Sequence, residues 1–238
     1  MKVYPNRTTA ETAHALIRHI IRLMEEQPEK IFHIAFSGGT TPSLMFDLWA
    51  NEYRADTDWK RMRIFWVDER CVPADNSDSN YGTMHNLLLS KVPIAEEYIH
   101  PICGANDPAA EALRYSNVVR SYVPKGTNGA PMFDIILLGA GDDGHTASIF
   151  PGQEYLLSGM LHPYEISFNP YTGQQRVGMT GTTLFNARSL VFFVTGKNKQ
   201  HVIHDIVASG DTCPSAFVAH HARQVELFTD VPSLVRHE

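Results

Sequence analysis

Two patterns of hydrophobic positions alternate along this chain: short apolar runs and longer stretches with helical spacing. Between residues 8 and 26, apolar side chains recur at three- and four-residue intervals, which predicts a helix capped by Thr8 or Thr9. Short apolar runs bounded by turn residues predict strands. The expected strands are 31–36, 63–67, 135–140, 176–180, 190–195 and 225–228, and the further helices are 81–89, 107–122 and 199–208.

One more helix is expected after Pro42, with Leu44, Leu48 and Trp49 on its inner side. Strands that alternate with helices indicate a three-layer α/β/α fold, Rossmann-like, with a mainly parallel sheet and helices on both faces. We expect one domain over residues 1–238, because no repeat, low-complexity run or linker interrupts it. The pattern loosens between 152 and 175, where we expect a flap or a small insertion.

Composition narrows the class of protein. The formal net charge of −6 favours neither nucleic acid nor an anionic membrane as a partner. Three widely spaced cysteines (Cys71, Cys103 and Cys213) without metal-type pairing suit reduced thiols, and no stretch reads as a signal peptide or membrane span. We therefore expect a cytoplasmic protein, as a monomer or small homo-oligomer.

The most informative segment is the predicted strand 135–140 and the glycine-rich turn after it. The turn carries Asp142, Asp143 and His145, and the chain beyond it starts like a helix. In α/β proteins, ligands bind at the carboxyl ends of parallel strands. A carboxylate and an imidazole in one tight turn at that place are candidates for proton transfer.

The same turn, residues 139–144, matches the Gly-x-Gly-x-x-Gly pattern of dinucleotide-binding proteins. Both variable positions before the last glycine are Asp, which would repel a pyrophosphate. The acidic strand end expected about 20 residues later is also missing. We therefore do not expect NAD binding.

A second strand end, Ser37-Gly38-Gly39-Thr40, leads into the helix after Pro42. Glycines allow a ligand close to the backbone, and the free N–H groups of a helix start favour phosphate. No Gly-Lys-Ser/Thr follows, so the segment is not a nucleotide P-loop. A strand-to-helix turn that is merely glycine-rich explains this segment equally well.

Charged residues follow the other predicted strands. Asp68 and Arg70 come after strand 63–67, Arg176 belongs to the extended run 176–180, and Lys197 follows strand 190–195. Taken singly, each is explained by a surface ion pair or a solvated side chain. Several cations on one sheet edge, beside a glycine-rich turn, point to a phosphorylated substrate.

Five segments of the chain together resemble the 6-phosphogluconolactonases. They are SGGTTPSLMFDLW, FWVDERCVPADNSDSNYG, FDIILLGAGDDGHTASIFPG, RVGMTGTTLFNARSLVFFVTGKNK and PSAFV, in that order between residues 31 and 218. The resemblance implies a glucosamine-6-phosphate deaminase-like fold. It also implies hydrolysis of 6-phospho-D-glucono-1,5-lactone to 6-phosphogluconate, a carboxylic ester hydrolysis of the oxidative pentose phosphate pathway.

Two alternatives stay open. The related glucosamine-6-phosphate deaminases carry Tyr in place of Arg70 and an Asn-Glu pair after the Gly-His pair, whereas residues 146–152 contain no acid. A non-catalytic sugar-phosphate-binding module would usually carry a DNA-binding segment, and neither end reads as a basic helix-turn-helix. The chain departs from the lactonase pattern at Gly178-Met179 and Gly181-Thr182, where we expect a less regular strand, and mildly at Asp142.

The resemblance and the residues together give a mechanism. His145 is the expected general base, kept neutral by a helix start, with Asp143 fixing its tautomer and Arg70 stabilising charge at the carbonyl. The mechanism requires neither a metal nor an organic cofactor. The residues expected to bind the phosphorylated sugar are Ser37, Gly38, Gly39, Thr40, Asp68, Ser148, Arg176 and Lys197.

Overall fold

A parallel sheet of seven strands is the centre of the computed structural model, which describes residues 1–231. The order of the strands is β1-β10-β9-β6-β2-β3-β5, and every pair is parallel. The strands are β1 (Lys2–Pro5), β2 (Phe32–Phe36), β3 (Met62–Trp66), β5 (Ile99–His100), β6 (Ile135–Leu138), β9 (Ser189–Phe193) and β10 (Val225–Thr229). The predicted domain extends to 238, and its residues 232–238 lie outside the described ones.

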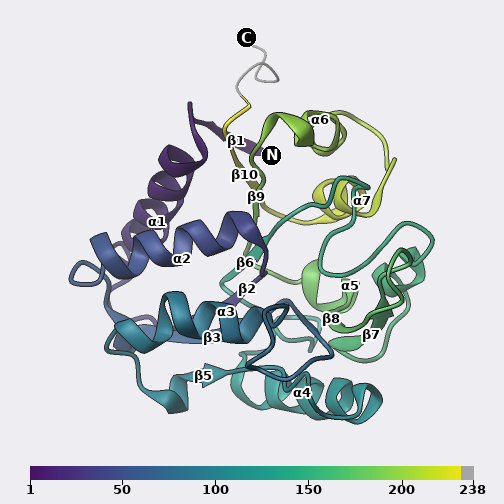
Figure 1. Ribbon diagram of the computed structural model, residues 1–238, viewed down its shortest axis with the longest axis horizontal. Helices are drawn as coiled ribbons and strands as arrows, with labels where there is room; N and C mark the ends of the chain where they lie inside the picture. Colours follow the sequence, from purple (N-terminus) through teal and green to yellow (C-terminus); the bar gives the residue numbers. More distant parts are fainter. Residues whose placement is uncertain (232–238) are drawn as a thin grey trace.

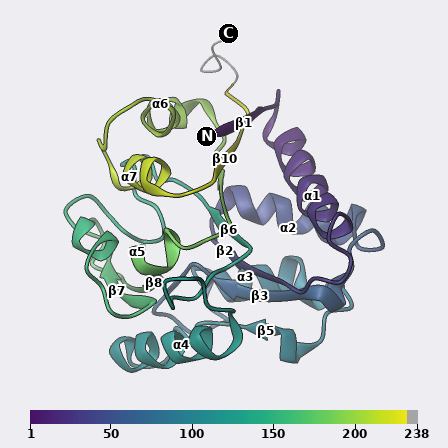
Figure 2. The same cartoon turned by 180° about the vertical axis from the view of Figure 1, so that it is seen from behind.

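Helices flank this sheet on both sides, as predicted for a three-layer fold (Figure 1). α1, α2 and α3 lie side by side in one group, and α6 and α7 pack together in another, an arrangement also seen from behind (Figure 2). Their bounds are α1 (Thr9–Glu25), α2 (Thr40–Glu52), α3 (Asn80–Leu87), α4 (Pro108–Tyr122), α5 (Gly181–Leu184), α6 (Gln200–Val207) and α7 (Pro214–His221). In residues 1–231, no helix has the length and apolarity needed to cross a membrane.

A second, antiparallel sheet of three strands adjoins the first. It contains β4 (Asp68–Arg70), β8 (Gln175–Met179) and β7 (Tyr164–Phe168), in that order, and packs against α4. Val67 joins the two sheets: its N–H donates to Phe36 of β2 at 2.9 Å, and its carbonyl accepts from Met179 of β8 at 2.8 Å. The residues that follow β3 are therefore held in place by both sheets.

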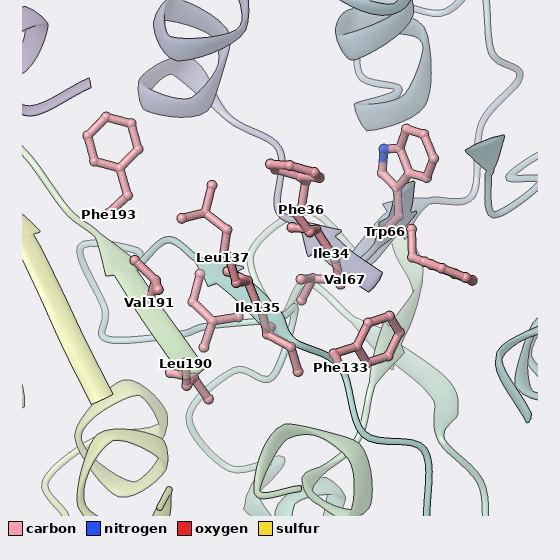
Figure 3. Close-up of a cluster of buried hydrophobic side chains, with 14 of the residues drawn as sticks. Ile34, Phe36, Trp66, Val67, Phe133, Ile135, Leu137, Leu190, Val191 and Phe193 are labelled. Carbon is pink, nitrogen blue, oxygen red and sulfur yellow. The ribbon is translucent and has the colours of Figure 1, made fainter. Parts of the chain in front are cut away.

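The core explains why the central strands read as continuous apolar runs. Their side chains are covered on both faces of the large sheet, as expected for a parallel sheet between helices. Figure 3 shows this cluster, with Ile34, Phe36, Trp66, Ile135, Leu137 and Val191 among its members, all at most 1% exposed.

Local signals predicted α1 well. The Thr8 side chain accepts a hydrogen bond from the Glu11 N–H, as an N-cap does. The prediction for α2 was wrong in one respect: Leu44 is 36% exposed, and the helix buries Met45 and Phe46 beside Trp49.

The structure corrects the expected course of the chain after β6. This strand ends at Leu138, and residues 139–153 form turns and bends in place of the expected helix. Ala147 and Ser148 take left-handed backbone conformations, with φ of 52° and 57°. Such values are uncommon for residues with a side chain, so the surrounding contacts must hold this segment in shape.

The small sheet was the least predictable part. The segment 152–175, expected as a flap or insertion, contains the one-turn helix η4 (Glu154–Leu157) and strand β7. β8 is regular despite Gly178, and 181–184 forms the short helix α5, contrary to the expected irregularity. β1, β4, β5 and α7 were also not predicted as elements.

Candidate active site

A cavity of about 240 Å³ opens at the carboxyl edge of the large sheet. It collects the segments after β2, β3, β6 and β9, the strand ends that the sequence singled out. Its lining includes Ser37, Gly38, Gly39, Thr40, Asp68, Arg70, Asn80, Gly139, Gly141, His145, Ser148, Arg176, Thr195 and Lys199.

The loop from Ser37 to Thr40 leads directly into α2. A Cβ atom on Gly38 would lie 1.9 Å from Oδ1 of Asn80, so this position requires glycine. Gly39 has a φ of 113° and supplies no side chain to cap the helix. The first N–H groups of α2 are therefore available at the cavity, and a helix start of this kind attracts anions.

Strand β4 positions the two charged residues predicted after β3. The buried carboxylate of Glu69 accepts hydrogen bonds from the backbone N–H groups of Arg70, Asn80 and Tyr81, at 2.7–2.8 Å, and from the Ser79 hydroxyl at 3.0 Å. These bonds fix β4 to the start of α3. Burial raises the pKa of Glu69 above its usual value in spite of them. Among residues 1–231, the surface ion pair considered for this segment does not form.

Arg70 and Arg176 face each other as register partners of β4 and β8. Arg176 therefore comes from the small sheet and not, as expected, from an end of the parallel sheet. Neither guanidinium forms an ion pair within residues 1–231, and both Nε atoms are buried without a hydrogen-bond partner there. Burial, and then the charge of Arg70, lower the pKa of Arg176. Two adjacent guanidinium groups without an ion-pair partner among the described residues favour an anionic ligand.

The turn between β6 and Ser148 holds an acid in contact with an imidazole. Nδ1 of His145 lies 2.6 Å from Oδ1 of Asp143, which also accepts the backbone N–H of His145 at 3.1 Å. Gly141 makes room for this pair, because a Cβ there would lie 2.1 Å from the ring. The Phe150 ring packs on the imidazole, with 4.4 Å between centroids.

The electrostatics of this turn favour an ionised acid. Burial alone would raise the pKa of Asp143, but the charge of His145 and its hydrogen bonds hold that pKa below the usual value. The expected help from a helix dipole is absent, because no helix starts at His145. Since a carboxylate can only accept, Nδ1 carries the proton, and the neutral ring has its lone pair on Nε2.

Asp68 and Ser148 both line the cavity and contact each other. The Ser148 hydroxyl donates to Oδ2 of Asp68 at 2.5 Å, and the left-handed conformation of Ser148 directs it there. Asn80 donates to the Asp68 carbonyl at 2.8 Å. The sequence did not single out Asn80, although it lies in the SNYG segment that supported the family resemblance.

Lys197 does not line the cavity, and Lys199 does. The one-turn helix η5 (Lys197–Lys199) turns Lys197 outward and brings Nζ of Lys199 to 2.7 Å from Oδ1 of Asp142. Asn198 also donates to Oδ1 of Asp142, at 3.1 Å. Both lysines lie in the run GKNK, so the sequence alone does not tell which of them lines the cavity. The course of the chain after Gly196 decides this.

The fold and the site together define an α/β enzyme class with a cation-rich pocket and an acid–imidazole pair at the carboxyl edge of its sheet. The profile of the family described as glucosamine-6-phosphate isomerases/6-phosphogluconolactonase matches residues 7–227. The chain belongs to this family, as the resemblance of its motifs predicted.

Two of the similar proteins are 6-phosphogluconolactonases. The chain is 39% identical over 216 residues to a 6-phosphogluconolactonase of Treponema pallidum, covering 89% of this chain and 86% of that protein. A solved 6-phosphogluconolactonase from Trypanosoma cruzi superposes with a TM-score of 0.86 at 28% identity, over 99% of this chain and 97% of the other. A monomeric glucosamine-6-phosphate deaminase shares the fold, with a TM-score of 0.81 at 18% identity over 99% of this chain and all of the other.

Proposed function

We propose that this protein hydrolyses 6-phospho-D-glucono-1,5-lactone to 6-phosphogluconate, with His145 as the general base. The observation that carries the proposal is the 2.6 Å contact between Asp143 and Nδ1 of His145, on a cavity that also holds Arg70, Arg176 and Lys199. The named relatives support the choice of substrate.

The reaction needs a base that removes a proton from the attacking water molecule. Nε2 of His145 takes a proton from a water molecule, whose oxygen attacks the lactone carbonyl. Asp143 holds the ring in the required tautomer and stabilises the imidazolium that forms. The bond between the carbonyl carbon and the ring oxygen then breaks, and the imidazolium returns its proton to that oxygen, which leaves a hydroxyl group and a carboxylic acid.

The cationic side chains of the cavity can bind the negative charges of the substrate. We place the phosphate at the start of α2, with Ser37, Gly38, Gly39 and Thr40, and with Lys199 in the role predicted for Lys197. Arg70 and Arg176 then stabilise the oxyanion or the phosphate, and Asp68 with Ser148 contacts the sugar hydroxyls. A buried guanidinium near a developing oxyanion is an effective source of electrostatic stabilisation.

The deaminase alternative is disfavoured at one position. Where a second acid would be required close to the imidazole, the aromatic ring of Phe150 packs on His145, and residues 146–152 contain no carboxylate. A non-catalytic binding module would have no need for the Asp143–His145 pair.

One experiment separates the three readings. Freshly prepared 6-phosphogluconolactone is followed above its spontaneous hydrolysis, and glucosamine 6-phosphate is assayed in parallel for ammonia release. We expect acceleration only with the lactone. Absence of any acceleration by the wild-type protein, with phosphorylated sugar still bound, would favour the binding module.

We further propose that residues 1–238 act as one domain, because both sheets meet at Val67 and share one core. We also propose that the protein is cytoplasmic and is a monomer or a small homo-oligomer. Three free cysteines are compatible with a reducing compartment. Size-exclusion chromatography with light scattering measures the oligomeric state.

A further inference from the structure

The segment PSAFV, one of the five that support the family resemblance, begins helix α7 and contacts the acid–imidazole turn. Ser215 is fully buried there, and its backbone N–H donates to the Gly144 carbonyl at 2.9 Å. Among residues 1–231, those that line the cavity include none from α7. Any influence of this segment on the site therefore passes through the turn.

The start of α7 takes its hydrogen-bond acceptor from the turn. The first N–H groups of a helix have no partner within it, and Pro214, in the first position, has no N–H at all. Among the described residues, the Cys213 side chain accepts no bond from the helix, as an N-cap side chain would. The Gly144 carbonyl takes this place, so α7 and the turn stabilise each other.

Cys213 holds the same glycine by close packing. A Cβ atom on Gly144 would lie 2.5 Å from Cβ of Cys213 and 2.7 Å from its Sγ. This Sγ also lies 3.3 Å from the Ser215 hydroxyl. A larger side chain at position 213 that points the same way would press on the backbone of the turn.

The peptide between Gly144 and His145 is held on both sides. Its carbonyl accepts from Ser215, and its N–H donates to Oδ1 of Asp143 at 3.1 Å. The same oxygen lies 2.6 Å from Nδ1 of His145. Because the carbonyl and the N–H belong to one rigid plane, a rotation that weakens the bond to α7 also withdraws the N–H from Asp143.

We propose that Cys213 is a positioning residue: with the Ser215 N–H, it fixes the Gly144–His145 peptide and so keeps the imidazole on Asp143. The inference rests on the proposed function, in which His145 is the general base. Such a base must lie within hydrogen-bond reach of the attacking water. A misplacement of about 1 Å can reduce the rate by about 10²-fold.

The test is a change of size at Cys213, with Cys213→Ser as the matched control. Serine keeps a similar size and a polar atom near Ser215, whereas leucine adds methyl groups next to Gly144. We expect Cys213→Leu to lower kcat for the lactone by about 10- to 100-fold relative to Cys213→Ser. The affinity for 6-phosphogluconate, measured by calorimetry, should change by less than about threefold, because the cationic residues of the cavity belong to other elements.

Two results would overturn the inference. A kcat of Cys213→Leu within about twofold of that of Cys213→Ser would show that the turn does not depend on Cys213. A parallel loss of kcat and of binding-competent protein would show a merely structural role. If Cys213→Leu does not fold, Cys213→Val takes its place under the same criteria, since the extended backbone at this position (φ −156°, ψ 166°) suits a β-branched residue.

A double variant tests the route through Asp143. In an Asp143→Asn background the contact between carboxylate and imidazole is already lost, so adding Cys213→Leu should lower kcat clearly less than in the wild-type background. An equal loss in both backgrounds would show that Cys213 acts on the reaction by another path and would refute the proposal.

Hydrogen exchange of the His145 backbone amide, followed by NMR without substrate, separates this inference from the proposed function. The amide proton is protected by its bond to Asp143. We expect it to exchange about 5- to 10-fold faster in Cys213→Leu than in Cys213→Ser, even in a protein that lacks lactonase activity. Equal exchange rates would refute the positioning by Cys213, whatever the activity of the wild-type protein.

Discussion

At the scale of single residues, three neighbours set the tautomer, the space and the packing of the His145 ring. Asp143 fixes which nitrogen carries the proton, Gly141 leaves room for the ring, and Phe150 covers one face of it. The sequence predicted the acid and the base from their spacing of two. It could not predict the contact of Phe150, because that depends on the bends and left-handed residues between 145 and 150.

Replacement of His145 by Ala removes the proposed base. We expect kcat/KM for the lactone to fall by about 10²- to 10⁴-fold, the usual contribution of general base catalysis. The matched control is His204→Ala, since His204 is a solvated histidine of α6 outside the cavity. A loss below about tenfold, in a variant with native circular dichroism, would remove His145 from the role of base.

At the scale of elements, the cavity depends on how closely α3 approaches the loop after β2. The Asn80 side chain, at the start of α3, occupies the space that a side chain on Gly38 would need. The sequence identified Gly38 as a phosphate-loop candidate but gave no sign of this packing. A close approach of residues 42 positions apart follows only from the pairing of β2 with β3.

Gly38→Ala should therefore destabilise the protein by about 1–3 kcal/mol, the usual cost of overpacking. In an Asn80→Ala background the contacts with Oδ1 and Cγ are gone and only Cβ of residue 80 remains, 3.0 Å away, so the same substitution should cost clearly less. Urea unfolding of the four proteins measures this coupling. Additive losses would mean that Asn80 is not what excludes a side chain at Gly38.

At the scale of the whole molecule, the edge of the large sheet opposite the cavity carries a buried ion pair. Nε2 of His19 in α1 lies 3.0 Å from Oε2 of Glu226 in β10, and the Ser189 hydroxyl of β9 donates to Oε1 at 3.0 Å. Burial opposes ionisation of Glu226, but the nearby His19 lowers its pKa to about 2. This pair could not be predicted from the sequence, because its members are separated by most of the chain.

This pair makes stability depend on pH. Because the pKa of Glu226 is lower in the folded protein than its reference value of 4.5, its stabilisation is complete above about pH 4.5 and disappears as the pH falls towards 2. Glu226→Gln should cost on the order of 2–3 kcal/mol at neutral pH and progressively less in acid. Urea unfolding between pH 3 and 7, with the exposed Glu29→Gln as control, measures this; a pH-independent difference would contradict it.

The origin of Arg70 and Arg176 in the small sheet has a consequence for how this enzyme family can diversify. His145 and the loop at Gly38 belong to the large sheet, whereas both arginines sit on strands that touch it mainly through Val67. Substitutions in the small sheet can therefore change which ligand is attracted while leaving the proton-transfer pair in place. In this architecture the acid–imidazole pair and the two arginines can therefore be varied independently of each other.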